Sequence, residues 1–193
     1  MAIKEILQIG DPRLKNKNAV LKPADTKLIK KLVADMVDTM GRDKIIGLAA
    51  PQIGANYKLF ITEPRETPYR SADQSDILRV FINPKIVKFS DRKTTIYEGC
   101  GSVAANFFGP VIRPAKIVIE AYDMDFKKFR LRCDGMLARV IQHEYDHLSG
   151  IEFVEKISDY KKVMNFEFYN KFIRNLPEQT AAGKISVIEF IQL

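Results

Sequence analysis

The stretch "QHEYDHLSG", residues 142–150, contains both histidines of the chain, four residues apart, with a glutamate directly after the first. On an α-helix, residues i and i+4 lie on one face, where two imidazoles can bind the same metal ion. A histidine pair on a helix is often only structural. However, two randomly placed histidines would fall four apart in on the order of one chain in a hundred, even before the glutamate is required. The stretch therefore predicts a helix that carries a metal site, and the rest of the fold must be built around it.

The motif helix is expected to begin at about Asp134 and to end at Gly150, because these residue types favour the two ends of helices. One stripe, apolar at one end and imidazole at the other, follows spacings of four, three and four: Met136, Val140, His143 and His147. Glu144 lies on the neighbouring face, where it can take a proton from metal-bound water and later give it to a leaving amine.

Patterns elsewhere predict an α+β fold with antiparallel or mixed sheets packed around the central motif helix, in a single domain over residues 1–193. Apolar residues at every fourth position predict a helix within 23–43. Residues 76–90 and 92–102 resemble strands, and Pro84 should limit the first to a sheet edge or a break. A hairpin is expected to turn near residues 123–127. A second helix over about 158–175, a loop at "LPEQTAAGK" and a strand-like tail are expected to follow.

Composition indicates a soluble protein of the reducing cytoplasm. Hydrophobic residues make up 46% and charged residues 28% of the chain, no apolar run approaches the roughly 20 residues that cross a bilayer, and two distant cysteines give no disulfide framework. The net charge of +7 includes the alternating stretch "FKKFRLR" (126–132), which we interpret as a solvated strand face rather than an RNA-binding patch. Without phosphate-binding glycines, zinc-finger spacing or an RNA-recognition pattern, neither a DNA partner nor a membrane partner is expected.

A catalytic metal site needs a third protein ligand, and the histidine pattern does not supply it. A third histidine six residues after the second is excluded, because Phe153 stands there. Glu167, about twenty residues downstream, is one option, although a surface ion pair is its plain alternative. Cys100 is the other option, because the flanking Gly99 and Gly101 let its sulfur approach a metal closely, although a free cysteine is usually a small buried hydrophobe. Spacing alone does not separate these two candidates.

Three segments in order, "GLAAPQIG" (47–54), "EGCGS" (98–102) and "QHEYDHLSG" (142–150), resemble the signature motifs of the peptide deformylases. The stretch "IGDPRLKNK" near the start also resembles the opening of that family, and the likeness covers about residues 3–157. Members of this family remove the formyl group from the N-terminal methionine of new chains. The resemblance therefore implies a peptide deformylase-like fold and N-formylmethionyl peptides on nascent chains as the substrate.

The resemblance also implies a role for each matching residue. Three of these residues would be the metal ligands: Cys100, His143 and His147. A metal-bound hydroxide would attack the formyl carbon with Glu144 as general acid and base, while the Gln52 amide and the Gly101 backbone N–H stabilise the oxyanion. The family implies Fe²⁺ as the native metal, with Zn²⁺, Ni²⁺ or Co²⁺ able to substitute, whereas ligand softness alone suits Zn²⁺.

By the same resemblance, the peptide would bind as an added β-strand. Its backbone partners would be Ile46, Gly47 and Gly99. The methionine side chain would lie in a pocket walled by Met136 and Val140.

Three departures from the family pattern bear on substrate preference more than on the reaction. Ile45 stands where the first motif usually has glycine, and Gly101 where the middle motif usually has leucine. Arg139 stands where an apolar pocket residue is expected, so it would reach toward an acidic substrate group or into solvent. Outside the ligand set, Glu98 is expected to pair with Arg113 and to support the site.

Two rival functions stay open. A zinc endopeptidase would use Glu167 as its third ligand, and a catalytically silent relative would bind formyl peptides or ribosomes without hydrolysing anything. The preferred interpretation is a monomeric, cytoplasmic deformylase whose basic surface contacts the ribosome.

Overall fold

The computed structural model describes residues 2–68, 70–104, 106–186 and 188–193, and its described strands form two antiparallel sheets. The larger sheet has the order β1-β2-β3-β6-β7-β9 and the smaller has the order β4-β5-β8. The larger sheet contains β1 (Gly47–Ala49), β2 (Leu59–Thr62), β3 (Arg79–Phe89), β6 (Lys116–Tyr122), β7 (Lys128–Asp134) and β9 (Ile188–Gln192). The smaller sheet contains β4 (Lys93–Glu98), β5 (Phe107–Pro114) and β8 (Met164–Asn165).

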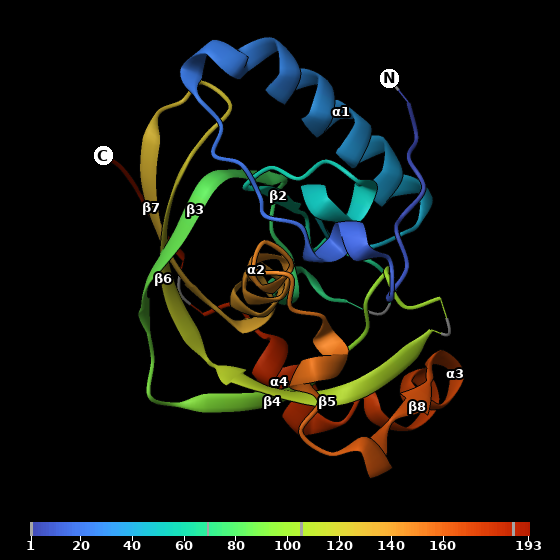
Figure 1. The fold of residues 1–193 in the computed structure, drawn as a ribbon. Coiled ribbons are helices and arrows are strands. Elements are labelled where there is room, and N and C mark those ends of the chain that lie inside the picture. Colours follow the sequence, from blue (N-terminus) through green and yellow to red (C-terminus); the bar gives the residue numbers. More distant parts are fainter. Residues whose placement is uncertain (1, 69, 105, 187) are drawn as a thin grey trace.

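The motif helix, α2 (Gly135–His147), lies between the two sheets, near the centre of the molecule (Figure 1). Leu137, Ala138 and Ile141 on one side of α2 join a buried cluster with β3, β6 and β7. The stripe with the two histidines lies on another side and faces the segment after β4. The α+β fold with a central motif helix is therefore confirmed, and burial of one face of α2 fixes where the other face points.

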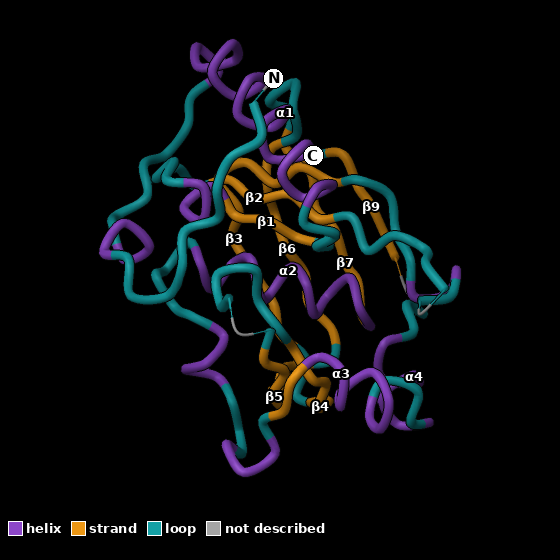
Figure 2. Tube along the Cα trace, turned by 90° about the vertical axis from the view of Figure 1, so that its right-hand side faces the viewer, coloured by secondary structure: helices purple, strands orange, loops and turns teal. Residues whose placement is uncertain are grey.

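The helix α1 (Thr26–Arg42) packs on the side of β1 and β2 that is opposite to α2, and Figure 2 shows it above these strands. Its buried residues Ile29, Met36 and Met40 pack with Leu48 and Ile61 of the sheet. Because β1 is thus packed between α1 and α2, its position relative to the histidines is fixed. Across the described residues, no helix is long and apolar enough to cross a membrane.

Local patterns placed most strands correctly. Along β7, Phe129, Leu131 and Cys133 are buried and the intervening arginines are exposed, which is the predicted solvated face. β6 and β7 form the predicted hairpin. β3 runs on through Pro84, but its register with β6 shifts between Ile82 and Lys85, so the proline lies at a break inside the sheet.

The predicted strand-like tail is confirmed as β9, but the predictions for the two segments before it were wrong. Residues 158–175 do not form one helix: a 3₁₀ turn (Tyr160–Lys162) is followed by β8, by α3 (Phe166–Phe168) and by a π-helical stretch (Tyr169–Ile173). The expected loop is the helix α4 (Pro177–Gly183), which begins at a proline and not at a typical polar cap. Ring contacts explain why the chain turns here, because Tyr169 stacks on Phe108 of β5 with ring centroids 4.3 Å apart.

α4 also occupies part of the open edge of β4. The Tyr97 N–H donates to Gln179 Oε1 over 3.1 Å, and Gln179 Nε2 donates to the Thr95 carbonyl over 3.2 Å. This side-chain amide therefore makes the two hydrogen bonds that a neighbouring strand would make. Beyond it, the strand leads to Gly99 and the segment that carries Cys100.

Candidate metal centre

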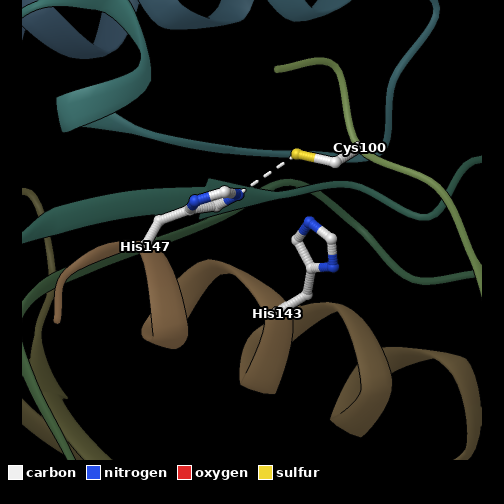
Figure 3. Close-up of side chains that lie close together, drawn as sticks. All are labelled: Cys100, His143 and His147. Carbon is white, nitrogen blue, oxygen red and sulfur yellow. Dashed lines mark hydrogen bonds between the residues drawn. The ribbon is translucent and has the colours of Figure 1, made fainter. Parts of the chain in front are cut away.

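Three side chains from two distant segments converge above α2 (Figure 3). Cys100 follows the end of β4, and His143 and His147 rise from the last two turns of the helix. One ligand atom from each residue lies within 4.8 Å of the others, and Cys100 Sγ is 3.3 Å from His147 Nε2. The structure thus brings Cys100, and not Glu167, to the two histidines, because Glu167 is exposed in α3.

The geometry of this group fits a divalent metal ion. With metal–sulfur and metal–nitrogen bonds of about 2.3 and 2.0 Å, a tetrahedral site holds sulfur and nitrogen about 3.5 Å apart, close to the observed separation. A thiolate and two imidazoles are ligands that Zn²⁺ and Fe²⁺ accept. Packing alone does not explain why two imidazoles and a sulfur lie this close together, whereas metal binding does. The fit is therefore chemical as well as geometric.

Glu98 fixes the orientation of His143. His143 Nδ1 is 2.9 Å from Glu98 Oε2, which leaves Nε2 directed at the ligand group. Burial lowers the pKa of His143, but the nearby Cys100 sulfur and Glu98 carboxylate outweigh burial and hold its pKa well above the usual range. The negative groups around His143 therefore favour positive charge at this position. A carboxylate behind a ligating imidazole is a common support for metal sites.

Glu98 is itself the centre of a buried charge network. Arg113 donates to both of its oxygens at 2.8 and 3.0 Å, and Arg139 donates to Oε1 at 2.9 Å. Arg113 also reaches Asp146 on α2, at 2.6 Å. Burial raises the pKa of Glu98, but the charge of Arg113 and the contact with His143 outweigh this effect and hold the pKa well below its usual range. The expected contact of Glu98 with Arg113 is present, within a larger network than predicted.

The interpretation of Arg139 needs correction. Its side chain does not reach solvent: it is 4% exposed, and its guanidinium donates to Glu98, to the Thr94 carbonyl at 2.8 Å and to the Val111 carbonyl at 3.0 Å. These acceptors hold the charged end of Arg139 within the network, although the residue also borders the pocket. Its partners are more than 25 residues away in sequence, so no local pattern could have revealed them.

His147 is supported differently. Burial and the charge of His143 lower the pKa of His147 well below the usual range, so it is the neutral member of the pair. Its Nδ1 makes no hydrogen bond among the described residues, and Glu152 Oε2 lies 3.7 Å away. Glu152 is 2% exposed and its oxygens also lack described hydrogen-bond partners. The sequence patterns did not predict Glu152. Its one signal is its position five residues after His147.

Glu144 lies beside the ligand group with one oxygen uncommitted. The residue is 4% exposed, and its Oε2 has no hydrogen-bond partner among the described residues. Burial raises the pKa of Glu144 to about 7, although the charge of His143 opposes this shift. A carboxyl group with a pKa near neutrality can both accept and donate a proton under physiological conditions.

Gly47 of β1 allows this close packing. A Cβ atom on Gly47 would overlap Glu144 Oε1 and would lie 2.6 Å from Val140 Cγ1. Only glycine therefore lets the strand edge run directly over Glu144. The sequence segment "GLAAPQIG" predicted a functional position here. The close approach of α2 explains why that position is a glycine.

The Gln52 side chain points at the ligand group from the 3₁₀ turn Ala50–Ile53 that follows β1. Its Oε1 accepts from the Ala49 N–H at 2.8 Å, so its Nε2 must face the other way, 3.6 Å from Cys100 Sγ and 3.2 Å from Ser102 Oγ. A donor is thereby held beside the metal position at the end of β4. The fully buried Ser102 was not predicted, and it also donates its N–H to Cys100 Sγ at 3.4 Å.

One pocket of about 740 Å³ contains this centre, and the remaining candidates line it. They are Ile46, Gly47, Gly99, Gly101, Met136 and Val140. β1 and the end of β4 both border the pocket, and each is an edge strand of its sheet, so one side of each lacks a strand partner among the described residues. The structure therefore gathers these candidates around a single cavity that Arg139 also borders, whereas Glu167 does not line it.

Known proteins match this chain over most of its length. The sequence model of the polypeptide deformylase family matches residues 3–163. A peptide deformylase of Neisseria gonorrhoeae is 42% identical over 167 residues, covering 84% of this chain and 91% of that protein. A peptide deformylase of Brucella suis is 32% identical over 185 residues, covering 96% of this chain and 99% of that protein. Among solved structures, a class I type b peptide deformylase from Acinetobacter baumannii with bound Met-Ala-Ser has a TM-score of 0.75, at 28% identity, and covers 81% of this chain and 99% of that one.

Proposed function

The chain belongs to the polypeptide deformylase family, and from this premise we propose how its own residues carry out the reaction. Peptide deformylases are metal-dependent hydrolases that remove the formyl group from the N terminus of nascent peptides, and this is the activity of the chain. The site contains a Cys-His-His group for the metal.

Cys100, His143 and His147 are the proposed ligands, and Fe²⁺ is the proposed native metal, with Zn²⁺, Ni²⁺ or Co²⁺ as substitutes. A divalent ion held by these three residues would supply Lewis-acid chemistry, polarising the formyl oxygen and making water a nucleophile near neutral pH. Glu98 holds His143 with Nε2 toward the ion, and the thiolate of Cys100 adds negative charge to the ligand set.

Glu144 is the proposed proton carrier. Its uncommitted Oε2 takes a proton from the attacking water and transfers it to the amine nitrogen as the formyl C–N bond breaks, which leaves formate and a free amino terminus. Gln52 Nε2 and the Gly101 N–H donate to the oxygen that becomes negative during attack. Donors held in advance in this way contribute roughly 3 kcal/mol each. The hydrogen bond from Ala49 to Gln52 supports this role, because it turns the amide N–H groups toward the centre.

The substrate is proposed to bind as a short strand between the backbone of Ile46 and Gly47 on one side and Gly99 on the other. Met136 and Val140, in line with His143 on α2, would contact the methionine side chain. Arg139 is not part of this proposal as a substrate contact, since its guanidinium is already engaged. The segment after residue 163 lines the same pocket, which supports one catalytic domain over residues 1–193.

The observation that carries these roles is the uncommitted, buried Glu144 beside three convergent ligand atoms. Formate release from a formyl-Met tripeptide by anaerobically prepared, iron-loaded protein tests the proposal. We expect turnover by the wild type and a loss of about a thousandfold in Glu144→Gln with the metal content unchanged. Absence of formate release from the loaded wild type would favour the silent relative.

Metal analysis of two further variants tests the ligand set. Cys100→Ala should lose metal, whereas Glu167→Gln should retain it, because Glu167 is exposed in α3. The reverse result would assign the third ligand to Glu167 and support the endopeptidase instead. Reloading Cys100→Ser with each metal distinguishes loss of the thiolate from misfolding.

Cytoplasmic location, a monomeric state and ribosome contact are also proposed. The net charge of +7 favours a polyanionic partner, and ribosomes present the nascent chain. Cosedimentation with ribosomes should be measurable at low salt and should weaken steeply at a higher salt concentration, and binding that ignores salt would contradict an electrostatic contact. Light scattering should give a mass near 22.1 kDa for the monomer.

A further inference from the structure

One wall of the pocket, which we call its far end, is built by parts of the chain that carry no motif. The loop between β2 and β3 contributes Arg65 and Arg70, and the stretch after β8 contributes Phe166, Tyr169 and Arg174. The second of these stretches lies beyond residues 3–163, which the family model matches. This wall is therefore a feature to explain from the chain itself.

Three guanidiniums meet in this wall, and we call Arg65, Arg70 and Arg174 the arginine cluster. Each is held in place by a neighbouring group. Arg65 donates to the Ile45 carbonyl at 2.9 Å and to Glu63 at 2.9 Å. Arg70 donates to the Arg65 carbonyl at 3.0 Å, and Arg174 donates to Asn170 Oδ1 at 2.7 Å. The cluster is thus an ordered arrangement of donors, not a group of free surface chains.

The cluster has more positive than negative charge. Among the described carboxylates, Glu63 forms an ion pair with the cluster, through Arg65. The nearby Glu66 is exposed and does not line the pocket. No carboxylate of the described residues pairs with Arg70, which is partly buried. Burial and then the charges of Arg174 and Arg65 lower the pKa of Arg70 to about 10. An anion in the pocket would relieve this repulsion.

Guanidiniums fixed in a partly dry pocket are well suited to bind a carboxylate, because they can donate two parallel hydrogen bonds. The pocket that contains them also contains the reaction centre, so a peptide bound there by its formylated end passes within reach of the wall. A nascent chain has no free C-terminal carboxylate nearby, which leaves the side chains of aspartate and glutamate as the source of the anion.

We propose that the arginine cluster is a specificity subsite that binds an acidic side chain within the first few residues after the formylmethionine. This inference rests on the proposed function of the same pocket. It predicts that the enzyme prefers nascent chains with an early aspartate or glutamate, and that Arg70 contributes most because no described carboxylate pairs with it.

The test uses metal-loaded enzyme and C-terminally amidated formyl peptides, so that a terminal carboxylate cannot replace the side chain. Aspartate, asparagine or lysine is placed in turn at the second, third and fourth position of formyl-Met-Ala-Ala-Ala-amide. For at least one position, we expect kcat/KM to be about tenfold higher with aspartate than with asparagine at low salt, and lowest with lysine. Addition of salt should reduce the preference.

Arg70→Gln should abolish the preference by lowering kcat/KM for the aspartate peptide more than for the asparagine peptide, and Arg70→Glu should favour the lysine peptide instead. Lys171→Gln is the matched control. Lys171 is a cation on the same C-terminal segment that lies over the Phe172 ring and does not line the pocket, so its replacement should change nothing. Metal content and the thermal midpoint of each variant identify any that fail to fold, and Arg174→Gln then serves as the second variant.

Equal kcat/KM for the aspartate, asparagine and lysine peptides with the wild type would overturn the subsite. An equal loss for all peptides in Arg70→Gln would do the same, because it would indicate a structural role. Calorimetric binding of the same peptides separates this inference from the proposed function. Without formate release, a charge preference in binding alone would still support the subsite, and its absence would reject it.

Discussion

At the metal end of the pocket, each guanidinium of the buried network has a carboxylate partner, whereas at the far end Glu63 pairs with Arg65 and no described carboxylate pairs with Arg70. The first arrangement is buried and hydrogen-bonded, with Glu98 at its centre. The second is partly exposed and keeps an excess of positive charge. Both arrangements use arginine. The first holds the metal-binding side chains in place, and the second is the proposed binding site for a substrate side chain.

The difference follows from what each end must do. Ligands of a metal have to be positioned before the substrate arrives, and a buried ion pair that is fully satisfied provides rigidity. Recognition of a variable peptide needs donors that are ordered but not yet neutralised. Each of the following predictions tests this contrast by removing a partner, a charge or a contact at one end.

The largest effect is expected from Glu98→Gln. This change leaves Arg113 and Arg139 buried without their shared carboxylate, which should cost about 3–5 kcal/mol of the free energy of unfolding. Metal affinity should fall by roughly 10- to 100-fold as well, because His143 loses its acceptor. Urea unfolding and metal titration measure the two effects. Arg70→Gln is the control at the far end and should change stability by no more than about 0.5 kcal/mol, and equal costs at both ends would refute the contrast.

The next effect concerns pH and the metal-free protein. Because the pKa of Glu144 is raised to about 7 in the fold, its contribution to stability is fully present below its unfolded pKa of about 4.5 and is lost as pH rises through 7. Glu144→Gln removes this dependence. The stability of the variant relative to wild type should therefore increase by about 3 kcal/mol between pH 4.5 and pH 8. Urea unfolding in chelator measures it for both proteins at each pH, and parallel curves for wild type and Glu144→Gln would contradict the burial effect.

Gly47→Ala tests geometry without changing charge. The added methyl group must displace Glu144 or Val140, and a shift of about 1 Å in a catalytic group can cost on the order of 100-fold in kcat. Metal content should be unaffected, since no ligand moves. Steady-state kinetics with a formyl peptide measures the loss. Gly41→Ala is the control, because a Cβ there meets no atom within 4 Å, and unchanged kcat in Gly47→Ala would show that Glu144 tolerates the displacement.

The smallest effect concerns the two departures beside the centre. A Cβ on Gly101 would lie 3.2 Å from Ile6 Cδ1 and 3.6 Å from Ile45 Cδ1, so Ile45 fills the space that a side chain at 101 would need. Gly101→Leu and Ile45→Gly should each destabilise the protein, while the double variant should recover about 1 kcal/mol relative to their sum. Thermal unfolding of the four proteins measures this coupling. Strict additivity would mean that the two departures are unrelated.

The motif helix and its neighbours were predictable because their signals are local. Helical spacing placed His143 and His147 on one face, and alternation identified β7. The ligand Cys100 needed more than spacing, since Glu167 stood at an equally plausible distance. The resemblance chose the cysteine, and the close approach of its sulfur to His147 agrees with that choice.

What escaped prediction depends on contacts between distant segments. Arg139 can be buried because Glu98, 41 residues earlier, forms an ion pair with its guanidinium. The C-terminal segment bends into a π-helical stretch where Tyr169 stacks on Phe108, although its composition suggested one continuous helix. The arginine cluster belongs to this same class, because Arg174 joins Arg65 and Arg70 from about 100 residues further along the chain and no motif connects them.

The amide of Gln179 on the edge of β4 has a consequence for turnover. On the proposed binding mode, a nascent chain can pair with the end of β4 near Gly99 but not with Thr95 or Tyr97, where Gln179 already occupies the backbone groups. The main-chain binding energy is therefore limited to a few residues, however long the new protein has become. Product release should then proceed at the same rate from a short peptide and from a long chain, which suits an enzyme that acts on chains of different lengths.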